Sequence, residues 1–158
     1  MYNALTRALE EELIPCFRHY EIDIVAYNPL AGGLLAKQYK SLSEIPNEGR
    51  FSDTEGNRSG KMYRDRYFND VYFDAINRLT PVVEKHGLTM AETALRWILH
   101  HSKLRPFDGD GIIIGASSVK QLESNLKDLQ KGSLPDEVVQ ALDEAWQTTR
   151  SVAKTYWR

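Results

Sequence analysis

Two short apolar runs limit most strongly how this chain can fold. The first lies at residues 22–26 and the second at residues 111–115, where three isoleucines follow one another. Continuous runs of this kind, rich in β-branched side chains, are typical of strands buried in a parallel sheet. Val25 and Ile113 lie 88 positions apart, and two strands alone cannot make a stable parallel sheet. We therefore expect an α/β fold whose flanking strands are missing or supplied elsewhere.

Helical periods of apolar residues surround the two runs. Three of the expected helices carry capping signals, namely Gly87 at a C-terminus, Thr89 with Glu92, and Ser118 with Gln121. The expected helices cover residues 5–17, which Pro15 bends or interrupts, and residues 71–83, 89–99, 119–129 and 135–146.

Residues 37–69 are polar and lack a clear period. A stretch of that length without secondary structure is usually a functional lid or a disordered insertion. Within it, residues 62–67 read Met-Tyr-Arg-Asp-Arg-Tyr, and Arg50 lies shortly before them. Arginines in a mobile loop can close over an anion through bidentate hydrogen bonds, whereas a solvated surface is the alternative fate of such a charge cluster.

Composition excludes several classes of protein. The 158 residues suit one domain, and 20 Lys+Arg against 22 Asp+Glu give a net charge of -2, which argues against binding duplex nucleic acid through a positive field. Cys16 is the single cysteine, so an internal disulfide and a cysteine-based zinc site are excluded, and a reducing cytoplasmic setting is expected. No apolar stretch approaches the ~20 residues that a membrane span needs.

The strongest local signal for a ligand is the strand-to-helix turn Gly115-Ala116-Ser117-Ser118. Free backbone N–H groups at a helix N-terminus, together with two hydroxyls and Lys120, suit a phosphate. The alternative is that Ser118 only caps its helix.

A second signal follows the first strand, where residues 28–35 read Asn-Pro-Leu-Ala-Gly-Gly-Leu-Leu. Ligands in parallel α/β folds bind beyond the carboxyl ends of the strands, and both loops leave strands at that end. One extended, phosphate-bearing ligand could therefore touch both loops. An ordinary tight turn is the alternative explanation for the two glycines.

Other catalytic patterns are missing from the sequence. His100 and His101 are adjacent, so a helix points them in different directions, and Asp108 and Asp110 flank Gly109 in what we expect to be a turn. A metal site is not expected. There is no Gly-x-Ser-x-Gly elbow and no Gly-x-x-x-x-Gly-Lys loop.

The motifs taken together resemble the aldo-keto reductases, most closely the aflatoxin aldehyde reductase branch. The resemblance runs in order along essentially the whole chain. It rests on residues 27–35, 49–51, 62–67, 94–97, 113–125 and 156–158.

That resemblance implies the C-terminal part of a (β/α)8 TIM barrel, incomplete as an isolated chain, with residues 1–158 forming a portion of an NADP-dependent oxidoreductase domain. It implies NADP(H) as cofactor, an aldehyde or ketone as substrate, and contact with neither nucleic acid nor membrane. The implied cofactor-binding residues are Asn28, Pro29, Leu30, Gly32, Gly33, Leu34, Arg50, Ser117, Ser118, Gln121 and Asn125, and the implied substrate-binding residues are Tyr63, Arg66 and Arg158.

The resemblance also implies that the catalytic residues lie elsewhere. In the family a tyrosine protonates the carbonyl oxygen, helped by a lysine, an aspartate and a histidine, and all four belong to the N-terminal half. We therefore expect no catalytic residue in this chain, a truncated barrel, and little or no reductase activity from it alone. Where the family loop continues Thr-Gly-Lys, this chain has Ala36, Lys37 and Gln38, so a lysine contact to the cofactor requires Lys37.

Two further expectations concern function and association. The alternative function is a non-catalytic NADP(H)-binding or interaction module derived from the same barrel. An open half-barrel exposes strand edges and apolar faces, so we expect a homodimer, association with a complementary barrel half, or poor solubility.

Overall fold

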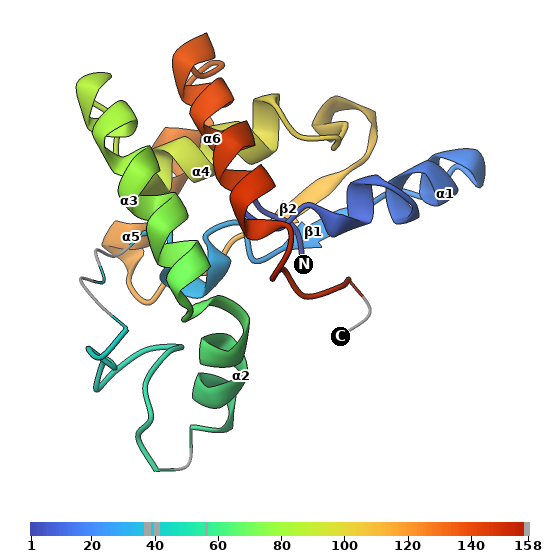
Figure 1. The fold of residues 1–158 in the computed structure, drawn as a ribbon. Coiled ribbons are helices and arrows are strands. Elements are labelled where there is room, and N and C mark those ends of the chain that lie inside the picture. The colour runs from blue at the N-terminus through green and yellow to red at the C-terminus, as the bar shows by residue number, and fades with distance from the viewer. Residues whose placement is uncertain (37–38, 40–41, 56, 157–158) are drawn as a thin grey trace.

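The computed structural model describes residues 1–36, 39, 42–55 and 57–156. It contains six α-helices and two strands in these ranges, arranged as Figure 1 shows. In chain order they are α1 (Leu13–His19), β1 (Val25–Tyr27), α2 (Arg58–Tyr67), α3 (Asp70–Lys85), α4 (Met90–His100), β2 (Gly111–Ile113), α5 (Val119–Leu129) and α6 (Asp136–Thr149), with short 3-10 helices at Ala8–Glu10, Ala31–Gly33 and Pro106–Asp108.

The two strands pair in parallel, as the sequence predicts, with Val25 opposite Gly111 and Tyr27 opposite Ile113. The prediction that both strands are buried is wrong for one face of the sheet. Ile24 and Ala26 point into the core, whereas Val25 and Ile113 are 61% and 57% exposed. Since side chains alternate along a strand, only the face toward the helices is covered among the described residues.

The helices form a layer beside this small sheet. Helix α3 packs along α6, and α4 packs against α5 and α3; Figure 1 shows α3 and α6 side by side. Ile14 of α1 belongs to the same core as Ile24 and Ala26, so α1 also covers the helix-facing side of the sheet. Arg7 joins α4 and α6, since its guanidinium lies 4.3 Å from the ring centroid of Trp97 and pairs with Asp143 at 2.6 Å. The main core gathers around Tyr2, Ile24, Ala26, Leu79, Trp97, Ile98, Val138 and Leu142.

The predicted caps are confirmed. Gly87 has φ 66°, and the N–H groups of Gly87 and Leu88 donate to the carbonyls of Glu84 and Val83, which closes α3 in a Schellman motif. Thr89 accepts from the N–H of Glu92 at 3.1 Å. The Glu92 carboxylate does not return to the cap, because it pairs with Arg96 instead.

Three sequence-based expectations need correction. The period from residue 5 to residue 17 does not form one helix; the chain makes a 3-10 turn and then α1, with Pro15 in the first turn of α1, where its missing N–H is harmless. Residues 37–69 are expected to lack secondary structure, but they contain α2. The helix is difficult to predict because most of its residues are polar and only Tyr63 and Tyr67 mark its buried face. Three of the four apolar residues of the α5 period (Val119, Leu122 and Leu126) are exposed, and the fourth, Leu129, is half-buried.

Asp110 fastens the starts of both strands. Its carboxylate accepts from the N–H groups of Ile24 (2.8 Å) and Arg105 (2.7 Å) and pairs with Arg18. Burial alone would raise the pKa of Asp110, but these hydrogen bonds outweigh it and hold that pKa below its ordinary value. The expected turn at Gly109 is present, with φ 105°.

No helix within the described ranges combines the length and the apolar character that crossing a bilayer requires.

Candidate functional site

The candidate site lies beyond the carboxyl ends of β1 and β2. Because the strands are parallel and in register, the segments that follow Tyr27 and Ile113 leave from the same edge of the sheet. The structure therefore brings the two glycine-bearing loops, residues 28–35 and 114–118, to one end of the molecule.

The first loop is held in an unusual backbone conformation. Asn28, Ala31, Gly32 and Gly33 all have positive φ, at 70°, 50°, 71° and 107°. Its amides are used within the loop: the N–H of Gly32 donates to Asn28 Oδ1 at 2.7 Å, and that of Gly33 to the Leu30 carbonyl at 2.8 Å. The amides of Gly32 and Gly33 are therefore not available to an anion. The loop can contact a ligand through its surface, but hydrogen-bond donors for an anion must come from other segments. Ala31, Leu34 and Leu35 anchor the loop in the core.

Gly32 is glycine because another residue approaches it closely. A Cβ built on Gly32 would lie 2.5 Å from the ring of Tyr63 in α2. Helix α2 thus supports the loop through Tyr63, and a larger residue at position 32 would displace the Tyr63 ring.

The second loop ends in the open N-terminus of α5. Ser118 accepts from the N–H of Gln121 at 3.2 Å, and Gln121 Oε1 accepts from the N–H and hydroxyl of Ser117. Within the part of the chain that the structure describes, the N–H groups of Val119 and Lys120 have no hydrogen-bond partner. They add to the positive end of the helix dipole.

Asn125 lies two turns further along α5. It is buried, and its side-chain amide makes no hydrogen bond to any described residue. It therefore keeps both its donor and its acceptor for a ligand.

Arg50 connects the two loops. Its Nη1 donates to the hydroxyl of Tyr63 at 3.1 Å, and its Nη2 lies 3.9 Å from the position that a Cβ on Gly115 would occupy. The guanidinium of Arg50 lies 5.4 Å from the centroid of the Tyr63 ring, and that of Arg66 lies 5.8 Å from it. Neither arginine pairs with a carboxylate of the described residues. Two uncompensated cations thus flank one aromatic ring between the loops.

The segment that carries Arg50 is tied to α2. Asn57 Nδ2 donates to the carbonyls of Gly49 and Ser52, both at 3.2 Å, and Arg64 Nη1 donates to the Phe51 carbonyl at 2.7 Å. A Cβ on Gly60 would collide with the Ser52 carbonyl. Arg50 therefore has a fixed base although it lies outside any helix or strand.

The structure places the sequence-predicted site residues in three groups. Arg50, Tyr63, Gly32 and the Gly115 turn come together, while Tyr63 itself is only 6% exposed and packs against the loop. Arg66 stands beside the same ring. Arg158, together with Lys37 and Gln38, lies outside the described residues.

Sequence reasoning missed two residues that shape this site, Tyr67 and Asn3. Tyr67 is fully buried, and its hydroxyl accepts from Asn28 Nδ2 at 2.7 Å and from Asn3 Nδ2 at 3.3 Å. The spacing of four between Tyr63 and Tyr67 is the signal that could have revealed both α2 and its inward face.

The histidines are structural. Nε2 of His101 accepts from the N–H of Leu134 at 2.8 Å, and burial lowers the pKa of His101, with a smaller contribution from the neighbouring His100. His100 Nε2 lies 2.8 Å from the Lys131 carbonyl. Among the described residues no group of three or more His, Cys, Asp or Glu could hold a metal ion.

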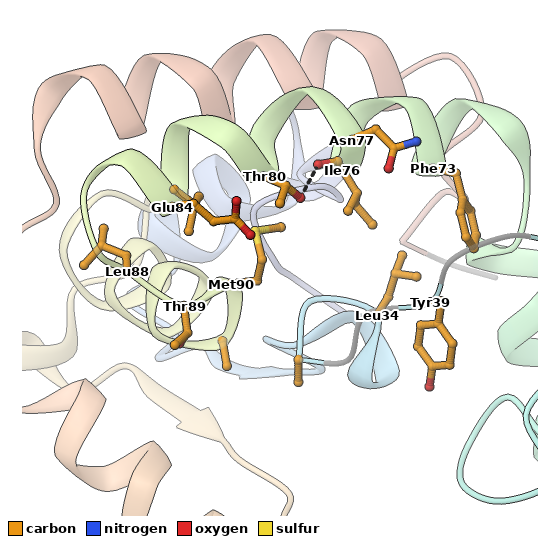
Figure 2. Close-up of a pocket in the computed structure, with 13 residues that line it drawn as sticks. Leu34, Tyr39, Phe73, Ile76, Asn77, Thr80, Glu84, Leu88, Thr89 and Met90 are labelled. Atoms are coloured by element: carbon orange, nitrogen blue, oxygen red, sulfur yellow. Dashed lines mark hydrogen bonds between the residues drawn. The ribbon is translucent and has the colours of Figure 1, made fainter.

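A separate pocket of about 790 Å³ lies between α3, the start of α4 and the end of the first loop (Figure 2). Its walls are mainly apolar, with Phe73, Ile76 and Met90 among them, and Asn77 and Glu84 supply polar groups. Among the residues that the structure describes, Leu34 is the one that this pocket shares with the sequence-predicted site.

Comparison with known proteins identifies the family of the chain. Residues 1–147 match the model of the aldo/keto reductase family. The chain belongs to that family.

The curated relatives are similar in sequence but longer. The chain is 43% identical over 157 residues to an aldo-keto reductase of Pseudocercospora fijiensis, covering 99% of this chain and 52% of that protein. It is 40% identical over 164 residues to aflatoxin B1 aldehyde reductase member 2 of Mus musculus, covering 100% of this chain and 44% of that one. The chain thus spans about half the length of the relatives it matches.

Solved structures share the fold. The glycerol dehydrogenase of Gluconobacter oxydans aligns with a TM-score of 0.59 and 24% identity, over 91% of this chain and 40% of that one. The holo form of an aldo-keto reductase from Bacillus halodurans aligns with a TM-score of 0.54 and 21% identity, over 99% of this chain and 42% of that one. At these identities the likeness concerns the fold alone.

Proposed function

We propose that residues 1–158 form the C-terminal portion of a (β/α)8 barrel and hold the phosphate-binding and substrate-pocket part of an NADP(H)-dependent reductase of aldehydes and ketones. The observation that carries this proposal is the position of Arg50. Its guanidinium lies between the first loop and the Gly115 turn, without a carboxylate partner in the described chain.

The residues present fit an anionic dinucleotide. The N–H groups of Val119 and Lys120, the Ser117 hydroxyl and the Asn125 amide, which has no partner among the described residues, suit the adenosine 2′-phosphate end, and Arg50 suits the pyrophosphate. We assign residues 28–35 to the opposite side of the same cofactor site. Bound NADPH supplies the hydride for reduction of the carbonyl.

Tyr63, Arg66 and Arg158 are assigned to the substrate side. Arg66 bears a guanidinium that no described carboxylate neutralises, and such a group favours an acidic aldehyde through charge-assisted hydrogen bonds. The burial of Tyr63 suggests that it acts mainly by placing the two arginines.

Catalysis requires groups beyond these. We infer that the tyrosine, lysine, aspartate and histidine of the family belong to a complementary half of the barrel, so that the chain alone reduces carbonyls slowly or not at all. General acid catalysis alone contributes about 10²- to 10⁴-fold, and orientation of the hydride contributes more.

Association with that half follows from the uncovered surfaces. The exposed face of β1 and β2 and the apolar residues of α5 would be covered by further strands of a barrel or by a second copy. We propose a small-molecule carbonyl as substrate and a homodimer or a barrel complement as partner, with neither nucleic acid nor membrane involved and a cytoplasmic location.

The cofactor proposal is tested by fluorescence titration of the purified chain with NADPH. Arg50→Ala is expected to weaken binding about tenfold or more, because it removes a charge-assisted contact. Arg58→Ala is the matched control, since Arg58 is exposed and forms no ion pair with a described residue. Equal affinity of the two variants and the unsubstituted chain would contradict the assignment of Arg50.

The reductase and the non-catalytic alternative are separated by a second assay. Reduction of succinic semialdehyde or 2-carboxybenzaldehyde is measured with the chain alone and after addition of the N-terminal half of a family member. Activity that appears only in the mixture supports the reductase. NADPH binding without activity in either case favours a cofactor-binding module, and full activity of the chain alone contradicts the assignment of catalysis to the other half.

A further inference from the structure

The first loop depends on the side chain of one residue, Asn28. Its φ of 70° is unfavourable for a residue other than glycine, although asparagine tolerates it better than most. Asn28 Oδ1 accepts from the N–H of Gly32, four residues later, and the Asn28 carbonyl accepts from the N–H of Ala31 at 3.0 Å. The Asn28 side chain therefore spans the base of the turn that presents Gly32 and Gly33.

The orientation of this side-chain amide is set by Tyr67. The Tyr67 hydroxyl oxygen accepts from Asn28 Nδ2 at 2.7 Å, and the hydroxyl donates to Met1 Sδ at 3.0 Å. Because the phenol oxygen takes the NH₂ group, Asn28 Oδ1 faces Gly32. Asn3 Nδ2 completes the cluster by donating to the Asn28 carbonyl at 3.1 Å.

The inner part of the cluster is shielded from solvent, which makes its hydrogen bonds difficult to replace. Tyr67 and Asn3 are both fully buried. Burial raises the pKa of Tyr67 above its ordinary value, so its hydroxyl stays neutral at physiological pH. Without the Tyr67 oxygen, the half-buried Asn28 amide and the buried Asn3 amide would each lose an acceptor, and at Asn3 water cannot readily replace it.

We propose that Tyr67 is a positioning residue for the cofactor loop: its buried hydroxyl orients the Asn28 side chain, and through it holds Gly32 against the ring of Tyr63, the residue that also contacts Arg50. This inference deepens the proposed function and rests on it for the identity of the ligand. The geometry of the loop itself is independent of that identity.

Tyr72 is a matched control. It is as buried as Tyr67, and the two rings are 5.4 Å apart. Its hydroxyl contacts Thr6 Oγ1 at 3.3 Å and the Leu5 carbonyl at 3.4 Å, and makes no contact with Asn28. Tyr72→Phe therefore removes an equivalent hydroxyl from the same core and leaves the turn intact.

The experiment measures hydrogen exchange at the Gly32 amide and the dissociation constant for NADPH in the 158-residue chain and its variants. Tyr67→Phe is expected to speed exchange at Gly32 about tenfold and to weaken NADPH binding about tenfold, whereas Tyr72→Phe changes both less than about twofold. Should Tyr67→Phe fail to fold, Asn28→Gly serves instead, because glycine accepts the backbone conformation while the two side-chain hydrogen bonds disappear.

The outcomes distinguish the positioning of the loop from the identity of its ligand. Equal Gly32 exchange in Tyr67→Phe and Tyr72→Phe, or in Asn28→Gly and the unsubstituted chain, overturns the positioning role whatever NADPH does. A selective rise in Gly32 exchange with no NADPH binding by any protein overturns the proposed cofactor and supports the positioning of the loop by Tyr67. A selective rise in exchange with unchanged NADPH affinity shows that the loop does not contribute to binding and overturns the inference.

Discussion

Helices α3 and α5 are both amphipathic, yet they bury opposite faces. In α3 the apolar residues Tyr72, Phe73, Leu79 and Val83 are buried against α6 and the core. In α5 the buried residues are polar, Asn125 and Asp128, and the apolar residues Val119, Leu122 and Leu126 are exposed. The difference shows that a helical period tells which residues are apolar, while burial depends on whether a partner surface is present.

The sheet repeats the same contrast. Its helix-facing side chains, Ile24 and Ala26, are buried, and the alternate positions Val25, Tyr27 and Ile113 are exposed. Helix α5 follows β2 directly, so the uncovered face of the sheet and the uncovered face of α5 belong to one βα unit. The helix-facing side of the sheet is thus packed as a protein core, whereas its exposed side and the exposed face of α5 have the apolar character of an interface.

The largest expected effect compares one leucine from each helix. Leu79 in α3 is 1% exposed, and Leu122 in α5 is 40% exposed. Leu79→Ala is expected to lower the free energy of unfolding by about 2 to 5 kcal/mol, because it leaves a cavity, and Leu122→Ala by less than about 1 kcal/mol. Urea denaturation measures both, and similar losses would remove the distinction between the two helices.

A second comparison uses two aspartates on either side of Gly109. Asp110 is buried and holds both strand starts, whereas Asp108 is exposed. Asp110→Ala is expected to cost about 2 to 4 kcal/mol of unfolding free energy, since it leaves Arg18 and two backbone N–H groups without their acceptor. Asp108→Ala should stay within about 0.5 kcal/mol. A stable Asp110→Ala variant would mean that the strands are held together by packing alone.

A smaller effect concerns pH. The pKa of His101 in the folded chain lies below its ordinary value of 6.5, with burial as the main cause. As the pH falls, the unfolded chain therefore binds a proton at His101 before the folded chain does. The contribution of neutral His101 to the unfolding free energy is complete above about pH 6.5, and it declines as the pH falls through the interval between 6.5 and the lowered pKa. The difference in unfolding free energy between the unsubstituted chain and His101→Gln, measured from pH 8 to pH 5, should shrink in that interval. A difference independent of pH would contradict a half-buried His101 that is neutral in the folded chain.

The smallest effect on stability is expected on the outward face of α5. Replacing Leu122 and Leu126 by lysine should change the unfolding free energy of the isolated chain by no more than about 0.5 kcal/mol, because neither side chain is packed. The same double variant should lose self-association or binding to a barrel complement in sedimentation velocity. Strong association of the variant would move the interface away from α5.

Much of this fold can be predicted from sequence because its signals are local. The two parallel strands, the Gly87 cap and the Thr89 and Ser118 caps each depend on residues within a few positions of one another. Helix α2 escapes prediction because polar and charged residues surround its two buried tyrosines. The exposure of Ile113 and Leu126 escapes it because no local pattern records whether a distant surface covers a side chain.

The candidate site divides in the same way. The glycine loop and the Ser118 turn are short motifs, and the resemblance to a family assigns them from the order of residues alone. The contacts of Arg50 with Tyr63 and the Gly115 turn, and those of Tyr67 with Asn28, join residues 13 to 65 positions apart. Such contacts emerge only when α2 is placed in space.

The close approach of Gly60 to Ser52 has a mechanical consequence. Hydrogen bonds from Asn57 and Arg64 hold residues 49–52 to α2, and the missing side chain at Gly60 lets the two segments approach closely, so the backbone beside Arg50 is fixed to α2. The covalent link through the exposed residues 53–55 is not what keeps Arg50 in place. A protease could cut the chain there, and the two fragments would stay together with the arginine still seated over Tyr63.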